Sequence, residues 1–297
     1  MLPPKRIAMS GGGMKGIAHI GVLEVLEKEG LLKRVKEYIG TSVGALISFA
    51  LCIGYTLSEL HTLCIALDFS LTQNIDPDNI FKCMETYGFD DGVNIEKLLI
   101  ILLKAKRLQP TITFEELDAL LPDRPALRVF AVNLKTCTIQ EFSFEKTPRV
   151  QVKWAVQASM TIPIYFTPMK DLSSNELYVD GGLIAQFPFH HLSSEERLDT
   201  LGLAFKRGDS NIDITKLEQY ILKLYYSVNH HQTTELYKAW GNRIIQIDCA
   251  DFPSFYFGAD PDEKSILIES GVEAARNYLD DHKWIVGKAP ARRYSLP

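Results

Sequence analysis

Short apolar runs alternate along the chain with segments of helical periodicity. Short apolar runs bounded by turn residues are typical of buried strands, and apolar residues three and four positions apart are typical of one face of a helix. This alternation predicts a layered α/β fold. The predicted strands are residues 6–10, 37–40, 127–134, 139–144, 164–167, 176–179, 200–205 and 244–248. The predicted helices are residues 17–29, 43–53, 57–66, 95–106 (capped by Asn94), 113–121, 150–159, 214–240 and 266–279.

Composition limits the class of protein. The chain has 297 residues, and neither an internal repeat nor a break in composition divides it. We therefore expect one domain over residues 5–285 and a flexible basic tail over residues 286–297. The net charge of −5 argues against nucleic-acid binding. The five scattered cysteines favour a reducing compartment and argue against a zinc site.

Residues 38–58 carry no charge and are long enough to resemble a membrane span. They contain Gly40, Gly44 and Gly54, and they begin as a strand and a turn. We interpret them as a buried strand followed by a buried helix. With neither a signal peptide nor a transmembrane segment predicted, we expect an intracellular protein peripheral to membranes.

A glycine-rich run, Gly11-Gly12-Gly13-Met14-Lys15-Gly16, joins the first predicted strand to the first predicted helix. Glycines at such a junction let the backbone turn its N–H groups toward one point, and the helix N-terminus favours negative charge there. The run also fits a dinucleotide-binding loop, which needs a carboxylate at the end of the next strand. That strand lacks one, because it runs directly into Gly40-Thr41-Ser42.

The segment Gly40-Thr41-Ser42-Val43-Gly44 is a G-x-S-x-G sequence between a strand and an apolar helix. In this context the serine lies on a sharp turn that exposes its hydroxyl, and the small flanking residues relieve crowding. The alternative is a tight turn in which Ser42 only caps the helix. Since neighbouring parallel strands carry the two motifs, we expect the N–H groups of the glycine run to lie close to Ser42.

The base for Ser42 is harder to identify. Only His282, of seven histidines, lies as late in the chain as the triad of an α/β-hydrolase requires, and it lies in a polar run typical of solvated surface. His19 fits a packing or helix-positioning role. Asp180 is the better candidate, because a strand delivers its carboxylate to the sheet edge and Gly181 and Gly182 let the following loop fold back. An ordinary Asp-Gly turn is the alternative.

Together, G-G-G-x-K-G, G-T-S-x-G and D-G-G resemble the patatin-like phospholipase family in order and spacing. The resemblance extends to residues 16–23 and 158–163 and covers about residues 5–203, with a weaker continuation to residue 279. One position departs from the pattern, because Gln186 stands where the family often has an asparagine before a proline. If this amide orients the loop that carries Asp180, the longer side chain changes its fine positioning.

The resemblance implies a three-layer α/β/α sandwich with a central, mostly parallel sheet. It implies Ser42 as nucleophile, Asp180 as base, and an oxyanion hole from N–H groups around Gly12, Gly13 and Met14. Such enzymes deacylate phospholipids or neutral glycerolipids without a metal or organic cofactor. A protein activator, a lipid acyltransferase or transacylase, and a non-catalytic lipid-binding scaffold stay open.

Three further features have two interpretations each. Lys15 either contacts a lipid phosphate or is solvated near the helix start. The aromatic stretch at residues 252–257 and the basic tail at residues 288–293 are candidate membrane-docking elements. For these two segments the alternatives are buried packing and a solvated tail.

Overall fold

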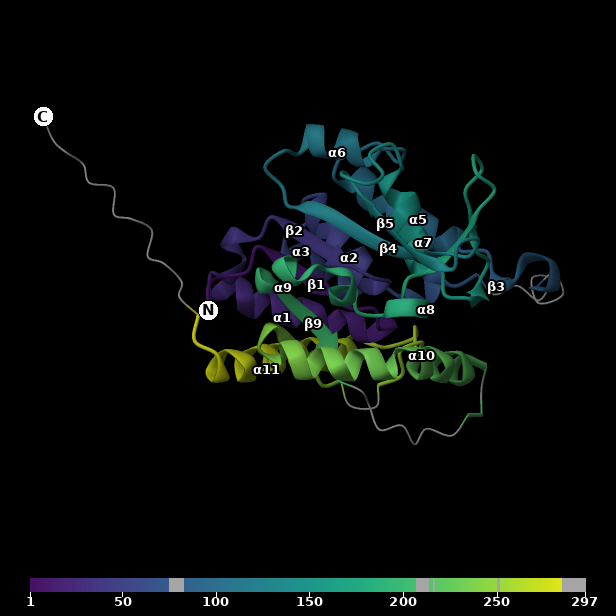
Figure 1. Ribbon diagram of the computed structural model, residues 1–297. Coiled ribbons are helices and arrows are strands. Elements are labelled where there is room, and N and C mark those ends of the chain that lie inside the picture. Colours follow the sequence, from purple (N-terminus) through teal and green to yellow (C-terminus); the bar gives the residue numbers. More distant parts are fainter. Residues whose placement is uncertain (75–82, 207–213, 216, 250–251, 285–297) are drawn as a thin grey trace, which may run out of the picture.

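The computed structural model describes residues 1–74, 83–206, 214–215, 217–249 and 252–284. A central sheet is covered by helices on both of its faces (Figure 1). The predicted tail at residues 286–297 lies outside the described residues. Within the described part of the chain, no helix is long and apolar enough to cross a membrane.

The main sheet has the order β10-β9-β1-β2-β4-β8-β7, and β5 pairs with β4. Strands β10, β9, β1, β2 and β4 are parallel to one another, whereas β5 and β8 run antiparallel to β4. The expected three-layer, mostly parallel arrangement is confirmed. The strands of this sheet are β1 (Arg6–Met9), β2 (Glu37–Gly40), β4 (Ala126–Asn133), β5 (Thr138–Ser143), β7 (Met169–Lys170), β8 (Leu177–Asp180), β9 (Thr200–Phe205) and β10 (Ile244–Ile247). A separate two-stranded sheet pairs β3 (Gly88–Asp90) with β6 (Ile164–Phe166).

The helices largely follow the predicted pattern. The α-helices are α1 (Ile17–Lys28), α2 (Val43–Cys52), α3 (Leu57–Ala66), α5 (Val93–Ala105), α6 (Phe114–Leu120), α7 (Val152–Met160), α8 (Gly182–Ala185), α9 (Ser194–Leu198), α10 (Leu217–Trp240) and α11 (Pro261–Asp281). Short 3-10 helices are η1 (Gly13–Gly16), η2 (Leu31–Arg34), η3 (Phe69–Thr72), η4 (Pro188–His191) and η5 (Gly241–Arg243). The unpredicted elements β3, β7, α8 and α9 are too short to show a period.

Two predicted helix starts are wrong. Helix α11 begins at Pro261, ahead of its apolar pattern, because Asp260 and Glu263 form a reciprocal capping box. Asn94 does not cap α5, since Gly92 is the capping residue. The Asn94 amide lies in the first turn instead and donates to the Gln73 carbonyl oxygen at 2.9 Å.

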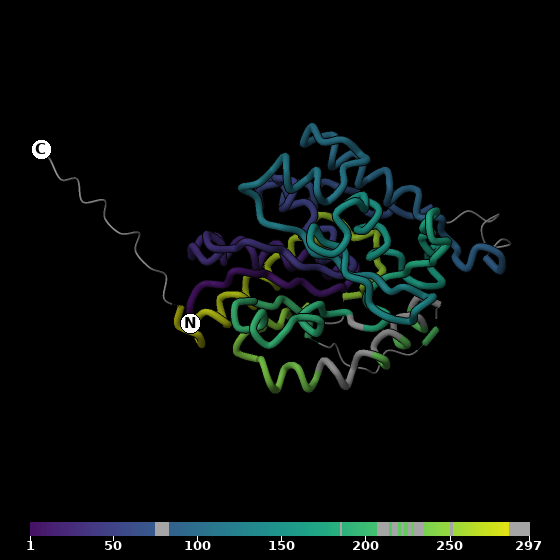
Figure 2. Tube along the Cα trace, turned by 45° about the horizontal axis from the view of Figure 1, so that its top comes forward, coloured from purple at the N-terminus to yellow at the C-terminus, as the bar shows by residue number. Residues whose placement is uncertain are grey.

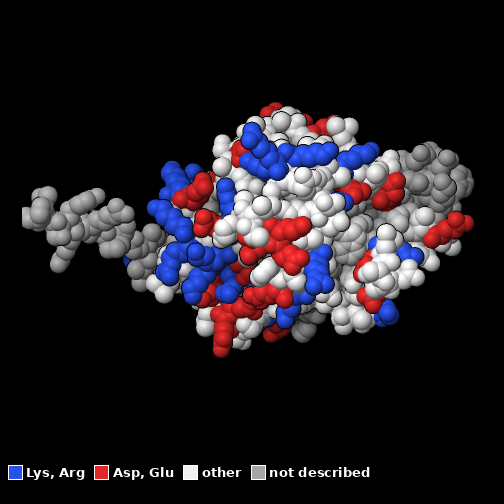
Figure 3. Space-filling view, turned by 90° about the horizontal axis from the view of Figure 1, so that it is seen from above, with Lys and Arg blue, Asp and Glu red and all other residues white. Residues whose placement is uncertain are grey.

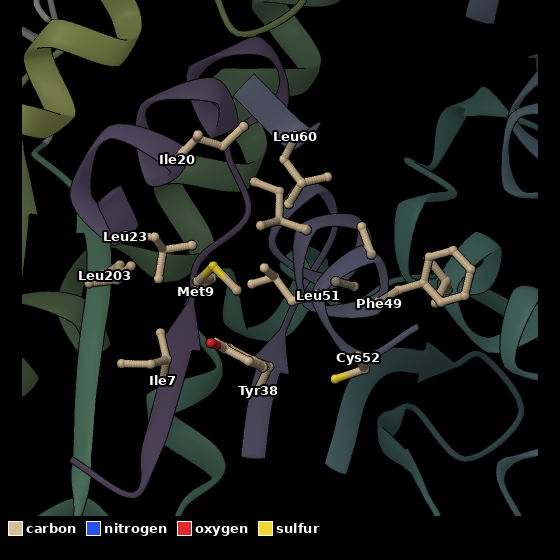
Figure 4. Close-up of a cluster of buried hydrophobic side chains, with 14 of the residues drawn as sticks. Ile7, Met9, Ile20, Leu23, Tyr38, Phe49, Leu51, Cys52, Leu60 and Leu203 are labelled. Carbon is tan, nitrogen blue, oxygen red and sulfur yellow. The ribbon is translucent and has the colours of Figure 1, made fainter. Parts of the chain in front are cut away.

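Alternating strand residues build a core on each face of the sheet. Ile7 and Met9 of β1 face α1 and α2, where Figure 4 shows them with Leu23. Ala8 between them points to the opposite face and joins a second core that includes Phe189. Because both faces of the sheet are buried, the strands appear in the sequence as continuous apolar runs. The uncharged stretch at residues 38–58 is β2 and the buried helix α2, as predicted.

The first and last long helices pack against each other. Figure 2 shows α11 beside α1, although they come from opposite ends of the described chain. Gly21 and Gly271 allow this contact, because a Cβ at either position would lie about 2 Å from a carbonyl oxygen of the other helix: 2.0 Å from that of Ile268 and 1.9 Å from that of Ala18. This packing anchors α1, which directly follows the glycine run.

Candidate active site

The glycine run and Ser42 lie side by side at one edge of the sheet. Strands β1 and β2 are parallel, with Met9 opposite Gly40, so both chains leave the sheet at the same level. A Cβ on Gly11 would lie 3.1 Å from the Ser42 Cβ. The expected proximity of the two motifs is confirmed.

Ser42 occupies a strained turn. Its φ of 55° and ψ of −126° lie in a region that residues with a side chain rarely adopt, at a cost of about 1–3 kcal/mol. A Cβ on Gly44 would lie 2.3 Å from the Met9 carbonyl oxygen, so only glycine fits there. The Ser42 side chain makes no capping hydrogen bond to α2. The capping alternative is therefore wrong, and the strain holds the hydroxyl away from the helix.

Ser159 supports this turn from α7. Its Oγ accepts the Ser42 N–H at 3.0 Å and donates to the Phe130 carbonyl oxygen at 2.6 Å. Ser159 is fully buried, so neither bond competes with water. The sequence interpretation gave Ser159 no role, although it lies in the segment 158–163 that carried part of the family resemblance.

Asp180 reaches Ser42 from the antiparallel part of the sheet. Gly40 of β2 lies opposite Val129 of β4, and Ala131, two residues further along β4, lies opposite Asp180. Ser42 is likewise two residues beyond Gly40. This register places Asp180 level with Ser42, and the Ser42 hydroxyl donates a hydrogen bond to the Asp180 carboxyl group.

Asp180 is only 2% exposed. Burial raises its pKa from the ordinary 3.8 to about 7, although hydrogen bonds from the Ser42 hydroxyl and the Gly182 N–H act in the opposite direction. The Gly182 N–H lies 2.7 Å from Oδ1. The Asp-Gly turn considered as an alternative is therefore present, and the same carboxyl group also contacts the serine.

Contacts from distant segments hold the glycine run. The Gly11 N–H donates to the Gln186 carbonyl oxygen at 2.9 Å, and the Gln186 amide donates back to the Gly11 carbonyl oxygen at 3.2 Å. The Met14 N–H donates to the Ser254 carbonyl oxygen at 2.8 Å. Gly13, with a φ of 56°, lies so close to Ser254 that a Cβ there would be 2.1 Å from the same oxygen. Ser254 gave no signal in the sequence.

These contacts divide the expected oxyanion donors. The Met14 N–H is engaged by Ser254. The N–H groups of Gly12 and Gly13 have no recorded acceptor within the described residues. Gly13 also lines the same cavity as Ser42. Among the described hydrogen bonds, the N–H groups of Gly12 and Gly13 are therefore the ones left available in this part of the glycine run.

Two basic side chains near the glycine run are buried. Lys15 is only 7% exposed, so the expectation that it is solvated is wrong. His19 is fully buried, which lowers its pKa to about 4 and keeps it neutral. Its Nε2 lies 3.0 Å from the Ser10 carbonyl oxygen, where the N–H donates. His19 thus positions the start of the glycine run.

His282, the other histidine considered as a base, stacks on Tyr278 at the end of α11.

An apolar cavity of about 100 Å³ adjoins Ser42. Apart from Ser42 itself, the only hydroxyl among its lining residues is that of Thr72. The apolar side chains that line it are Met14, Ile17, Val43, Leu46, Ile47, Phe69, Ile95, Leu98, Met160, Ile162, Phe166 and Phe257. None of the described residues that line it is a histidine, and the described part of the chain contains no cluster of His, Cys, Asp or Glu that could hold a metal ion. The cavity suits a hydrocarbon chain that ends at the serine hydroxyl.

Comparisons with known proteins find relatives in sequence and in fold. The probable lipid hydrolase 463L of Invertebrate iridescent virus 6 is 30% identical over 201 residues, which cover 66% of this chain and 67% of that protein. The uncharacterized protein YqhO of Bacillus subtilis is 28% identical over 289 residues, covering 91% of this chain and 96% of the other. The crystal structure of VipD from Legionella pneumophila shares the fold, with a TM-score of 0.64 at 17% identity over 94% of this chain and 67% of that one.

A family model described as patatin-like phospholipase matches residues 7–193. The match includes the glycine run, Ser42, Ser159 and Asp180. Because it extends over more than half of the chain, the protein belongs to the patatin-like phospholipase family.

Proposed function

We propose that this protein is a lipid acyl-hydrolase of the phospholipase A type, with Ser42 as nucleophile and Asp180 as base. One observation carries the proposal: a serine on a strained turn donates a hydrogen bond to a buried carboxyl group beside an apolar cavity. Membership of the patatin-like phospholipase family supports it, and the related protein 463L is itself named a probable lipid hydrolase.

In the proposed reaction, the ionised Asp180 accepts the Ser42 proton as the serine oxygen attacks the ester carbonyl. The free N–H groups of Gly12 and Gly13 stabilise the negative charge on the carbonyl oxygen, an effect typically worth about 10²–10³ in rate for each donor. Asp180 then returns the proton to the departing alcohol. Water gives its proton to the same carboxylate, attacks the acyl-serine, and releases the fatty acid while Ser42 regains the proton.

The proposed substrates are phospholipids or neutral glycerolipids, approached from a membrane surface. Lys15 bears on the choice between them, because its side chain is mostly buried and its ammonium group has no recorded ion pair among the described residues, which favours a nearby anion. A phosphate ester supplies such an anion and a neutral glyceride does not. We therefore place phospholipids first.

The test is mass-spectrometric product analysis of the purified protein and its Ser42→Ala variant on vesicles that contain both phospholipid and triacylglycerol. We expect free fatty acid and the matching lysophospholipid from the wild type only. A fluorophosphonate probe provides an independent measurement, since it should label wild type and not Ser42→Ala. Equal product from both proteins would contradict the role of Ser42.

Two other outcomes identify the alternatives. Labelling without fatty-acid release, but with transfer of the acyl group to added lysolipid, would indicate a transacylase. Neither labelling nor turnover by well-folded protein would indicate a lipid-binding scaffold.

A further inference from the structure

The segments at the outer part of the cavity turn apolar side chains in two directions. Phe69 of η3 lines the cavity, whereas Leu71 of the same turn is 69% exposed. The aromatic stretch at residues 252–257 shows the same arrangement, because Phe257 lines the cavity and the neighbouring Tyr256 is 44% exposed. Phe252 and Phe255 pack against the core. Most of that stretch is therefore packing, and Tyr256 is its exposed aromatic side chain.

The small sheet adds two more exposed apolar residues. Phe166 of β6 lines the cavity, whereas Ile164 of the same strand is 43% exposed. Ile164 lies opposite Gly88 of β3, and Tyr87, the residue before Gly88, is 63% exposed. We call Leu71, Tyr87, Ile164 and Tyr256 the rim.

Tyr165 joins the segments of the rim into one surface. Its ring packs against Phe255 and Phe257, with centroids 6.0 and 6.4 Å away. Its hydroxyl is hydrogen-bonded to Gln73, directly after η3. The pairing of β3 with β6 brings in Tyr87. The four exposed side chains therefore lie on segments that contact one another around the cavity.

Two rim residues are held in strained backbone conformations. Tyr87 has a φ of 64° and Ile164 a φ of 71°. A positive φ is rare for any residue with a side chain and is a clear outlier for a β-branched one. Strain of this kind persists where the surrounding structure imposes it, and it clusters at functional sites. Here it accompanies apolar side chains that face solvent.

We propose that the rim docks onto a lipid surface and inserts its apolar side chains there. This inference rests on the proposed function, because the rim is continuous with the cavity that ends at Ser42. The cavity of about 100 Å³ is smaller than the roughly 150 Å³ cavity that takes up benzene, so most of a fatty acyl chain must lie outside it. The rim provides the apolar surface for that remainder.

Charge favours insertion over electrostatic attraction. The chain carries a net charge of −5, which repels anionic lipid. On the face shown in Figure 3, basic and acidic side chains are interspersed, and neither sign covers it. We therefore expect docking to zwitterionic lipid, with little dependence on salt.

The binding experiment uses sedimentation with sonicated phosphatidylcholine vesicles, in the Ser42→Ala background so that no lipid is consumed. The rim variant combines Leu71→Gln, Tyr87→Asn, Ile164→Asn and Tyr256→Gln, since asparagine tolerates a positive φ. We expect its vesicle affinity to fall on the order of 100-fold relative to Ser42→Ala alone.

The control variant removes comparably exposed apolar side chains near the amino-terminal ends of the parallel strands, on the side of the sheet away from Ser42. Leu2, Leu120 and Leu198 precede β1, β4 and β9, and Phe144 follows the antiparallel β5. Their combined replacement (Leu2→Gln, Leu120→Gln, Phe144→Asn and Leu198→Asn) should leave vesicle affinity within about threefold. Circular dichroism should show that both variants are folded.

A second arm separates this inference from the proposed function. With Ser42 intact, the rim variant should hydrolyse water-soluble p-nitrophenyl butyrate at the wild-type rate and phosphatidylcholine vesicles far more slowly. If wild type hydrolyses neither substrate, the proposed function fails, whereas rim-dependent vesicle binding by Ser42→Ala still supports docking.

Four results would overturn the inference. The first is unchanged vesicle binding by the rim variant, and the second is an equal loss in the control variant. The third is binding that requires phosphatidylserine or disappears at high salt. The fourth is a rim variant that turns a dimer into a monomer without loss of vesicle binding, which would show that the rim joins two copies of the chain.

Discussion

Ser42 and Asp180 meet at one point but come from two differently built parts of the sheet. Ser42 follows the parallel strand β2, and its conformation depends mainly on the strained turn and the flanking glycines, with one supporting hydrogen bond from its N–H to Ser159. Asp180 ends the antiparallel strand β8, and its place depends on pairing with β4 and on a hydrogen bond from its own N–H to the Thr161 carbonyl oxygen. The segment that carries Ser42, the nucleophile side, is therefore shaped mainly by adjacent residues. The segment that carries Asp180, the base side, is positioned by tertiary contacts.

The largest expected effect is at Asp180, on the base side. Asp180→Asn keeps the shape of the turn but removes the proton acceptor, so turnover should fall by about 10²–10⁴ while the fold is retained. Steady-state kinetics on vesicles, with circular dichroism, measures both. Asp91→Asn is the matched control, because Asp91 also precedes a glycine in a tight turn and should leave turnover unchanged. Near-normal turnover by Asp180→Asn would show that the base lies elsewhere.

Ser159 connects the two sides, so its loss should misplace the nucleophile without removing any reacting group. Ser159→Ala leaves the buried Ser42 N–H without its acceptor, and kcat should fall about 10- to 100-fold with KM little changed. The rate of fluorophosphonate labelling should fall in parallel. Ser48→Ala is the control, because Ser48 is equally buried and its hydroxyl has no recorded partner. A purely structural role for Ser159 would lower stability and leave kcat unchanged.

The pH dependence sharpens the contrast, because only the base side titrates near neutrality. With the pKa of Asp180 raised to about 7, the ionised form required for proton transfer increases about tenfold between pH 6 and pH 8. The pH profile of kcat/KM should rise over this interval. A profile that is already flat above pH 5 would contradict a buried base.

The same shift predicts a stability effect of definite sign. The folded protein holds a proton on Asp180 that the unfolded chain releases above its ordinary pKa of 3.8. This contribution to stability is complete below that value and is lost as the pH rises through about 7. Asp180→Asn lacks the dependence, so its stability relative to wild type should increase from pH 4 to pH 7. Urea denaturation at several pH values would measure the difference.

The smallest expected effect is at Gln186, which ties the base loop to the glycine run through one side-chain hydrogen bond. Gln186→Ala removes that bond but keeps the backbone contact with Gly11, so turnover should fall only about two- to tenfold. Gln140→Ala is the control, because Gln140 lies on the hairpin strand β5 and its side-chain amide likewise donates to a backbone carbonyl oxygen. A loss as large as that of Asp180→Asn would mean that Gln186 orients the base itself.

The difference between the two sides also determines what the sequence reveals. The glycine run and the Ser42 turn were predicted because their conformations follow from adjacent residues, and the parallel pairing of β1 with β2 followed from chain order. Asp180 was a candidate on its Asp-Gly-Gly context, but its level in the sheet depends on a strand register that no local pattern encodes. Ser159, Tyr165 and Ser254 act through contacts with residues far away in the chain, which periodicity does not detect.

The contacts of the glycine run have a consequence for biosynthesis. The N–H groups of Ser10, Gly11 and Met14 donate to Leu203, Gln186 and Ser254, so residues near the N-terminus are held by residues that the ribosome adds much later. A nascent chain exposes Ser42 early but lacks the segments that shape the loop beside it. The loop beside Ser42 can therefore take its final shape only after residue 254 has been synthesised.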